Sequence, residues 1–298
     1  MTGLWNLIRR NCKLFFKDRG MFFSSLITPL LLLVLYATFL AKIFRDSFAS
    51  AIPASFPVDE GLIGATVGGE LFSSLLAVSC ITVSFCCNMI MVQDKVTGAR
   101  RDLTVTPVKK SVLALSYYVS TLFSTLTVCA VATAASFLYL ARVGWYLSLS
   151  DVLLIALDIF LLVMFGTALS SIVNVFLKTP GQISAVGTVV SAGYGFVCGA
   201  YMPISQFGAG LQKVLSFLPG TYGTSIIRNH AMNGVYREMA ATGFPDEVIE
   251  GIKDSVDCNL YFFGDKVGLG AMYAVLAGSI AALIAVYILI NALRRRRG

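Results

Sequence analysis

The 298-residue chain is 57% hydrophobic and only 13% charged, which excludes an ordinary soluble domain, in which about a quarter of the residues are charged. Its formal net charge of +7 comes from basic residues that gather at the ends of apolar segments. Lipid head groups and membrane topology explain that distribution better than nucleic acid does, so we expect membrane lipids and no nucleic acid as partners. The composition predicts a polytopic helical membrane protein.

Residues 3–18 are an amphipathic stretch. Leu7 and Phe15 fall on the apolar face of a helix, and basic residues such as Arg9 and Lys13 occupy the rest. This pattern is typical of a helix that lies in the membrane interface. A secretory signal is the competing interpretation, but the apolar run that follows begins too late and is too long for one.

Six apolar segments are long enough to cross a membrane as helices. These predicted spans are residues 21–44, 62–92, 112–141, 152–177, 183–202 and 267–293. Pro29 predicts a kink in the first span. Six spans put both termini on one side of the membrane, and 15 of the 23 Lys and Arg residues fall on that side. We therefore expect both termini in the cytoplasm.

The segment 93–111, QDKVTGARRDLTVTPVKKS, joins the second and third spans and carries five basic residues. Such dense charge belongs in water, and its positive excess indicates the cytoplasmic side. Residues 94–103 contain no proline and predict a short helix, which ends before Thr106 and Pro107. Two interpretations remain open here: a rigid contact for another protein, and an ordinary positively charged loop.

Residues 203–266 differ from the rest of the chain. The apolar part, 203–227, is broken by Pro and Gly, so we expect two re-entrant half-helices that dip into the outer leaflet. The polar part, 228–266, carries seven acidic residues between Glu238 and Asp265 and predicts a small structured subdomain outside the membrane. Residues 45–61 predict a further outer loop.

No pattern for catalysis or cofactor binding stands out. The chain has no G-x-x-x-x-G-K-[ST] sequence to hold ATP phosphates, and a single histidine, His230, is too few for a His-based metal site. We expect His230 to cap or solvate the outer region, and Cys258 to be the one thiol outside the membrane. The chain is therefore expected to have no catalytic residue, no metal and no cofactor of its own.

Small and polar residues recur along two of the spans. The second span contains Ser73, Ala77, Cys80, Ser84, Cys87 and Asn88, and the fifth contains Ser184, Thr188, Ser191, Gly195, Cys198 and Gly199. Two interpretations stay open: close packing of neighbouring helices, and an adaptable wall that faces a central cavity.

Two acidic residues lie within predicted spans near their outer ends. We expect Glu70 and Asp158 to reach water or to pair with Arg142, with contact to a substrate or proton as the alternative.

Four features of the chain resemble the permease subunits of type 2 ABC transporters, the class that includes bacterial drug and antibiotic exporters. The first is LIRRNCKLFFKDRGMFFSSLITPLLLL, an amphipathic helix that leads into a proline-containing span. The second is the loop 93–111, which is similar to the family's E-x-x-x-G-T-x-E-x-L-x-x-T-P stretch but departs from it at Gln93, Ala99 and Arg101. The third and most specific is GAYMPISQFGAGLQKVLSFLPGTYGTSIIR, and the fourth is the last span with its basic tail.

The resemblance implies roles for particular residues. The loop 93–111 would contain a coupling helix that docks on an ATPase subunit through Gly98, Arg100, Arg101, Asp102, Leu103, Thr104, Thr106 and Pro107. The translocation path would be lined by Ser73, Ala77, Cys80, Ser84, Asn88, Thr188, Ser191, Gly195 and Cys198. An outer gate would include Pro203, Leu218 and Pro219. Two permease copies, expected to be identical, and two ATPase subunits, which hold ATP and Mg²⁺, would make the working unit.

The expected fold is therefore an all-α polytopic membrane protein with six spans, an interfacial helix, a cytoplasmic coupling helix and re-entrant outer half-helices. The expected function is ATP-driven export of a hydrophobic or amphipathic compound, such as a drug, lipid or peptide, across a bacterial inner membrane. A permease for lipid-linked polysaccharide is the first alternative. A channel or secondary transporter without an ATPase, and a membrane anchor or sensor, are the others.

Overall fold

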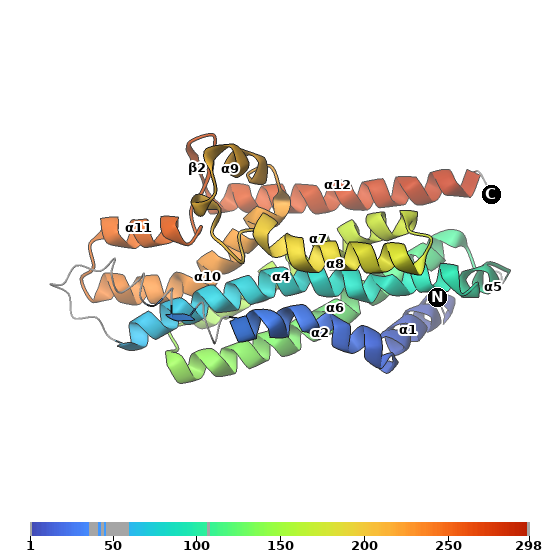
Figure 1. The fold of residues 1–298 in the computed structure, drawn as a ribbon, viewed down its shortest axis with the longest axis horizontal. Helices are drawn as coiled ribbons and strands as arrows, with labels where there is room; N and C mark the ends of the chain where they lie inside the picture. The colour runs from blue at the N-terminus through green and yellow to red at the C-terminus, as the bar shows by residue number, and fades with distance from the viewer. Residues whose placement is uncertain (1, 36–40, 43–44, 46–59, 106–107, 297–298) are drawn as a thin grey trace.

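The structure, a computed structural model of the chain, describes residues 2–35, 41–42, 45, 60–105 and 108–296. It is an elongated bundle of helices that run roughly along one axis (Figure 1). In this described part, four helices are long and apolar enough to cross a membrane. They are α4 (Glu60–Val96), α6 (Lys110–Val143), α7 (Leu149–Phe176) and α12 (Leu269–Arg296). These helices are those of a multi-pass membrane protein.

The remaining helices complete and extend the bundle. Three of them, α1 (Thr2–Lys17), α2 (Arg19–Leu35) and α8 (Pro180–Val197), pack along the long helices. The others are α5 (Ala99–Val105), the short 3-10 helix η2 (Ile204–Gln206), α9 (Ala209–Leu215), α10 (Pro219–Ala241) and α11 (Asp246–Ser255). Helices α4, α6, α7, α8 and α12 overlap the predicted spans 62–92, 112–141, 152–177, 183–202 and 267–293, and the crossing of the membrane by six helices stays a prediction. Of the expected outer loop 45–61, residues 46–59 lie outside the described residues.

One small sheet departs from the expected all-α fold. Strands β1 (Leu260–Phe262) and β2 (Asp265–Val267) form an antiparallel hairpin in which Leu260 pairs with Val267 and Phe262 with Asp265. The two residues of the turn, Phe263 and Gly264, both have positive φ angles, 53° and 102°. This is the backbone that a two-residue hairpin turn requires, although a bulky side chain rarely adopts it.

Helix α4 is the centre of the bundle. It packs against α2, α6, α7, α8 and α10, and 94% of its most apolar window is buried inside the protein. A helix that is apolar on all sides is covered either by other elements of the protein or by lipid, and α4 is covered by protein. The main core accordingly joins Phe72, Leu76 and Ile81 of α4 to residues of α7 and α10 such as Leu162 and Ile226.

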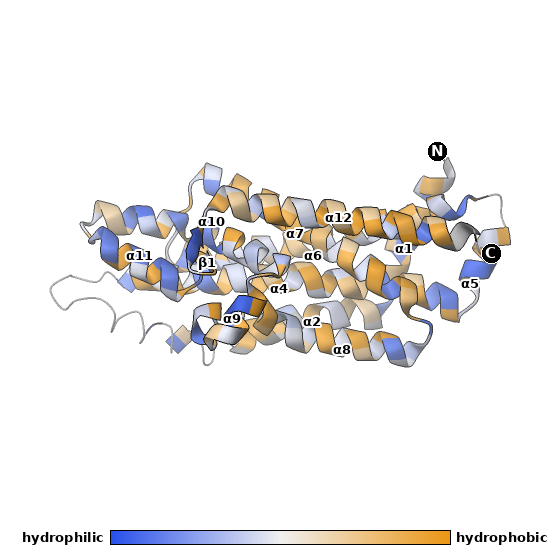
Figure 2. Ribbon diagram, turned by 90° about the horizontal axis from the view of Figure 1, so that it is seen from above, coloured by the Kyte–Doolittle hydropathy of each residue, from blue (hydrophilic) through white to orange (hydrophobic). Residues whose placement is uncertain are grey.

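The two ends of the bundle differ from its middle. Helix α5, the start of α1 and the end of α12 lie at one end, and α11 lies at the other (Figures 1 and 2). Figure 2 shows hydrophobic residues along the middle of the bundle and hydrophilic residues concentrated toward both ends. We refer to these as the α5 end and the α11 end. The pattern is that of a protein whose middle lies in hydrocarbon.

Helix α10 corrects one expectation about residues 203–266. The predicted boundary between an apolar half-helix and a polar subdomain at 227–228 is wrong, because α10 runs unbroken from Pro219 to Ala241 and buries Arg228. Position 234 requires a glycine because a Cβ atom there would lie 2.1 Å from the Tyr146 carbonyl oxygen. The glycine lets α10 approach the backbone that joins α6 to α7.

The expected helix over 94–103 is also wrong in its extent. Helix α4 continues to Val96, and α5 begins separately at Ala99. Gly98 between them has a φ of +83°, the left-handed conformation that ends a helix and that glycine adopts without strain. The chain therefore turns at Gly98, and α5 is a distinct short rod. Thr106 and Pro107 lie outside the described residues.

Candidate functional site

A groove of about 1170 Å³ lies between α2, α4 and α8. Hydroxyl groups of Ser24, Ser184, Thr188 and Ser191 interrupt a wall that is otherwise mostly apolar. None of the described residues that line the groove carries a charge. Its volume is slightly above the range of about 300 to 1,000 Å³ that is usual for pockets that hold drug-sized ligands. The groove can therefore accept a large apolar or amphipathic molecule.

Only some of the residues predicted to line a path lie on this groove. Thr188 and Ser191 do, while Cys198 is 1% exposed. A Cβ atom on Gly195 would lie 2.3 Å from the ring of Tyr201, which covers that position. The structure places Ser73, Ala77, Cys80, Ser84 and Asn88 inside the protomer. A path along them stays a prediction, and in this structure α4 instead contributes Cys86, Met89 and Gln93 to the groove.

The buried stripe of α4 packs closely against α7. Gly166 of α7 lies where a Cβ atom would come within 3.0 Å of the Cys80 carbonyl oxygen and of the Ser84 hydroxyl. Asn88 Nδ2 donates hydrogen bonds to the hydroxyl oxygens of Ser170, at 3.1 Å, and Ser171, at 2.9 Å. Small side chains and short polar contacts at this spacing hold the two helices together.

The end of α4 that leads to α5 is fixed on one side by Asp94. Arg10 of α1 binds its carboxylate with two nitrogens, at 2.6 and 2.8 Å, and the Tyr117 hydroxyl of α6 donates a further hydrogen bond at 2.6 Å. The hydrogen bond with Asp94 raises the pKa of Arg10, although burial lowers it. Bidentate, charge-assisted bonds of this kind are short and directional. Asp94 thus joins α4 to α1 and α6.

The next residue, Lys95, fixes the same end of α4 to α7. Its Nζ donates hydrogen bonds to the carbonyl oxygens of Asn174, Val175 and Leu177, at 2.6, 3.0 and 3.2 Å. A lysine at this place donates to carbonyl groups that a helix leaves unpaired at its C-terminus. Its positive charge also interacts favourably with the negative end of the helix dipole. Helix α8 begins shortly afterwards, with Thr179 as its N-cap. We call Asp94 and Lys95 the base of the rod.

Helix α5 projects from this base. Arg101, Asp102 and Thr104 are exposed, while Arg100 and Leu103 are partly buried. None of the described residues of α5 is buried. Of the residues predicted to contact an ATPase, Arg100, Arg101, Asp102, Leu103 and Thr104 lie on this short helix of about two turns at the end of the bundle (Figure 1), and their coupling role stays a prediction.

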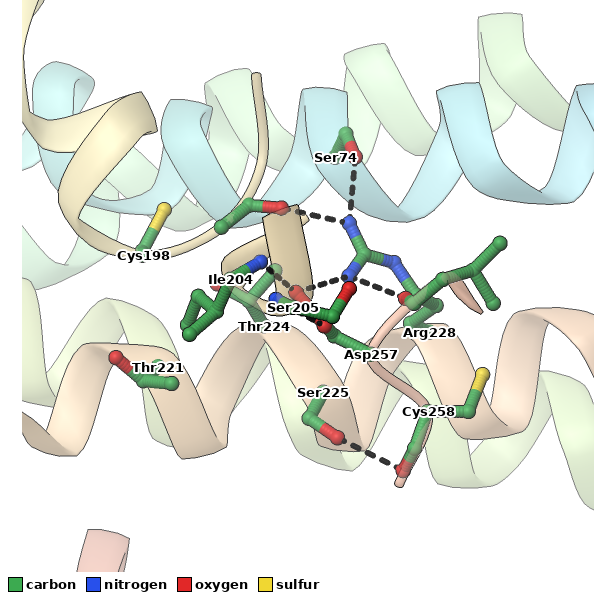
Figure 3. A network of polar contacts seen from close by, with 12 residues as sticks. Ser74, Cys198, Ile204, Ser205, Thr221, Thr224, Ser225, Arg228, Asp257 and Cys258 are labelled. Atoms are coloured by element: carbon green, nitrogen blue, oxygen red, sulfur yellow. Dashed lines mark hydrogen bonds and ion pairs between the residues drawn. The ribbon is translucent and has the colours of Figure 1, made fainter. Parts of the chain in front are cut away.

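At the other half of α4 lies a buried cluster around Arg228 of α10 (Figure 3). Its guanidinium forms a 2.7 Å ion pair with Glu70 and donates hydrogen bonds to the Ser74 hydroxyl and to the carbonyl oxygens of Gly199 and Val256, at 3.0, 3.0 and 2.6 Å. Glu70 and Arg228 are 3% and 1% exposed. The expectation that Glu70 reaches water or pairs with Arg142 is therefore wrong.

Asp257 extends the Arg228 cluster to the segment after α8. Its carboxylate lies 4.0 Å from Arg228 and accepts hydrogen bonds from the backbone N–H groups of Ile204 and, at 3.2 Å, Ser205. Burial raises the pKa of Asp257, and the charge of Arg228 lowers it. The cluster connects α4, α10, η2 and the segment after α11 (Figure 3).

Asp158 and His230 form a second buried pair. His230 Nδ1 lies 2.6 Å from an Asp158 oxygen, and the Tyr273 hydroxyl donates to the other oxygen. Asp158 is 1% and His230 5% exposed. The expectations that Asp158 reaches water or pairs with Arg142, and that His230 is solvated, are wrong. The three residues join α7, α10 and α12.

The residues predicted to form an outer gate lie at the turns beside this cluster. Pro203 precedes η2, and Leu218 and Pro219 begin α10. The Thr221 hydroxyl donates to the Leu215 carbonyl oxygen at 3.0 Å, which holds α9 against the start of α10. The structure thus places the three residues next to η2, after α9 and at the start of α10, and their role as a gate stays a prediction.

Residues 65–293 match the family model described as "ABC-2 family transporter protein". The match covers most of the chain. The chain belongs to this family. It is a membrane transport subunit of an ABC system, a class of permease that generally has no nucleotide site and works with a separate ABC ATPase. No match was found among curated proteins.

The cysteines of this ABC-2 permease are free thiols. Cys258, expected outside the membrane, is 1% exposed and lies 3.3 Å from the Tyr236 hydroxyl. Burial raises the pKa of Cys258 to about 12, so the thiol is protonated and unreactive at neutral pH.

The sequence interpretation missed the residues with the most polar contacts. Asp94 and Lys95 were expected as charges of a short helix in a loop in water, and Arg228 as the last residue of the family-like stretch and the start of a polar region, and no partner was predicted for any of them. A signal was present for the first two, because the helical pattern of the second span continues through them without a Gly or Pro. For Arg228 the signal was weaker: it is a lone basic residue that directly follows Ile226 and Ile227.

Proposed function

We propose that this chain is the permease subunit of an ATP-driven exporter that moves a hydrophobic or amphipathic compound out of the cell. Two copies would work with two ATPase subunits, which hold ATP and Mg²⁺. In this proposal the α5 end is cytoplasmic, and the chain lies in the plasma membrane, the inner membrane of a bacterium. The excess of basic residues on that side supports the orientation.

The observation that carries the proposal is the position of the groove beside the rod. Gln93 and Val96 of α4 and the next residue, Thr97, line the groove, and Gly98 and α5 follow immediately. A displacement of α5 would therefore act directly on the wall of the groove. The uncharged lining supports an apolar or amphipathic substrate, because an ionic substrate would need buried partners for its charge.

The contacts at the base of the rod suggest how such a displacement would spread. Asp94 would carry it to α1 and α6, and Lys95 to the C-terminus of α7. The turn that starts at Leu177 leads directly into α8, which forms much of the groove. Rigid helices joined by short charged contacts move together, so ATP-driven movement of α5 would alter the separation of α4 and α8.

The proposal is tested by reconstituting the permease with the ATPase subunits that co-purify with it. ATP-dependent transport of a panel of lipophilic fluorescent dyes and phosphate release are measured together. The double substitution Arg100→Glu/Arg101→Glu reverses the charge of α5 and is expected to abolish transport. Ser191→Trp is expected to fill part of the groove and to stop transport while the ATPase subunits still bind.

The matched control is Ala241→Trp, which places the same bulk on an exposed residue at the α11 end. It should transport as the unmodified permease does. Dye transport that needs no ATPase, or that survives the charge reversal of α5, would contradict the proposal and favour a channel or secondary transporter.

A further inference from the structure

Three phenylalanine rings near the α11 end are packed on one another but left largely uncovered. The rings of Phe217, Phe262 and Phe263 lie edge to face, with centroids 4.9 to 5.9 Å apart. Phe217 and Phe263 are 62% and 61% exposed, and Phe262 is 37% exposed. Phe217 follows α9, and the other two come from the β1–β2 hairpin. We call these three residues the aromatic wedge.

The backbone of the hairpin is strained at Phe263, one of the residues of the aromatic wedge. Phe263 occupies the first turn position with a φ of 53°, where Asn or Gly would be unstrained. A bulky side chain in this region is an outlier in proteins. The turn therefore holds an aromatic ring outward, against Phe217 and Phe262, although a smaller residue would suit the turn better.

The surroundings of the wedge combine apolar side chains with a positive charge. Leu211 and Val214 of α9 are 47% and 60% exposed. The Nζ of Lys213 lies 5.8 Å from the centroid of the Phe263 ring. Aromatic rings with nearby aliphatic and lysine side chains are typical of the boundary between lipid head groups and acyl chains, where rings are buried and amines meet phosphates.

The position of the wedge along the bundle agrees with that chemistry. Strand β2 ends at Val267 and the apolar helix α12 begins at Leu269. Figure 1 shows α9 and β2 beside this start of α12 and raised from the bundle, whereas α11 and the end of α10 extend further along the axis. The wedge thus continues the lipid-facing surface of α12 at the level where that helix would leave the membrane.

We propose that the aromatic wedge inserts into the head-group boundary of the leaflet on the α11 side and that Lys213 binds lipid phosphate there. The contact would hold α9 and the hairpin against the membrane surface. The inference requires only that the chain spans a membrane, and it does not depend on ATP or on the transported compound.

Tryptophan fluorescence tests the proposal. The chain has two tryptophans, Trp5 and Trp145, which are replaced by Phe to give a silent background. Phe263→Trp, or Phe217→Trp as a second reporter without the strained turn, is then placed in vesicles of phosphatidylcholine and phosphatidylglycerol with lipids brominated near the head group. Bromine quenches only an indole that it contacts. We expect quenching of both reporters and little quenching by aqueous acrylamide.

Two control variants define the limits of the assay. Ile288→Trp replaces an exposed residue on the apolar surface of α12 and should be quenched by brominated lipid. Ala241→Trp lies at the end of α10 and should be quenched by acrylamide alone. Quenching of both reporters by acrylamide alone would place the wedge in water. Protection from both quenchers would show that protein, such as a second copy of the chain, covers the wedge. Either result overturns the proposal.

Discussion

Arg228 shows how a single residue holds several segments together. Its guanidinium is 1% exposed and contacts one carboxylate directly, a second at 4.0 Å, one hydroxyl and two backbone carbonyl oxygens. An ion pair removed from water is costly to form, but it is more costly to break, because the remaining charge has no solvent. The cluster therefore stabilises the fold only while all its members are present.

We predict that Arg228→Met lowers the free energy of unfolding by about 3–5 kcal/mol, because it leaves Glu70 and Asp257 buried without their cation. The double variant Arg228→Met/Glu70→Gln should lose less than the sum of the two single losses, since the residues share one contact. Unfolding of the detergent-solubilised permease, followed by circular dichroism, gives the measurement.

The matched control for Arg228 is Lys266→Met. Lys266 pairs with Glu250 at 2.7 Å, and both side chains are nearly half exposed. An exposed pair of this kind contributes at most about 1 kcal/mol. If Arg228→Met were no more harmful than Lys266→Met, the Arg228 cluster would not be a determinant of stability.

At the scale of elements, the base of the rod joins α4 to its neighbouring helices, and Lys95 makes the contact with α7. Lys95→Met keeps the length of the side chain but removes the three hydrogen bonds to the end of α7. We predict that it destabilises the permease by only about 1 kcal/mol, because helix-terminal charges contribute on that order. Transport per ATP hydrolysed should fall steeply, while the ATPase subunits still co-purify.

Lys110→Met is the control for this prediction, because Lys110 is exposed at the start of α6 and its substitution changes the net charge equally. It should leave coupling unchanged. Equal coupling in Lys95→Met and the unmodified permease would show that α7 does not receive movement through Lys95.

Much of the element pattern could be predicted from the sequence, because hydropathy decides where a helix crosses a membrane. The sequence did not predict which face of each helix contacts which neighbour. Helix α4 is apolar nearly all round, so its periodicity does not distinguish the stripe of Ser84 and Asn88, which packs on α7, from the stripe of Met89 and Gln93, which lines the groove. The choice depends on the neighbouring helices.

Polar pairs between residues far apart in the chain could not be predicted from the sequence for a similar reason. Glu70 and Asp158 were recognised as ionisable residues inside predicted spans, yet their partners Arg228 and His230 lie on α10, which the sequence divided between a half-helix and a subdomain. A break was expected at the glycines of α10, but packing against α4 and α7 maintains the helix across them. Tertiary packing overrides local propensity here.

For the whole molecule, the two hydrophilic ends of the bundle indicate that the protein places charged segments on opposite sides of a membrane. Helix α5, the start of α1 and the end of α12 lie at one end, and α11 lies at the other (Figures 1 and 2). Charged segments remain in water on the two sides of a membrane because their burial in hydrocarbon is costly. The proposed orientation follows from the basic residues around α5.

We predict that a cysteine at position 105 faces the cytoplasm and a cysteine at position 241 faces outward. Val105 is 82% exposed at the end of α5, and Ala241 is exposed at the end of α10. The variants Val105→Cys and Ala241→Cys are made with Cys12→Ser, because the other six native cysteines are buried. A membrane-impermeant maleimide should label Val105→Cys only in inside-out vesicles, and Ala241→Cys only in intact spheroplasts.

The Cys12→Ser background serves as the control and should remain unlabelled in both preparations. Labelling of Val105→Cys in intact spheroplasts would reverse the orientation and remove the cytoplasmic contact that the exporter proposal requires. Labelling of both positions from the same side would show that the chain crosses the membrane an even number of times between α5 and the end of α10. Helices α6, α7 and α8, together with the turn before α10, would then have to be reassigned relative to the membrane.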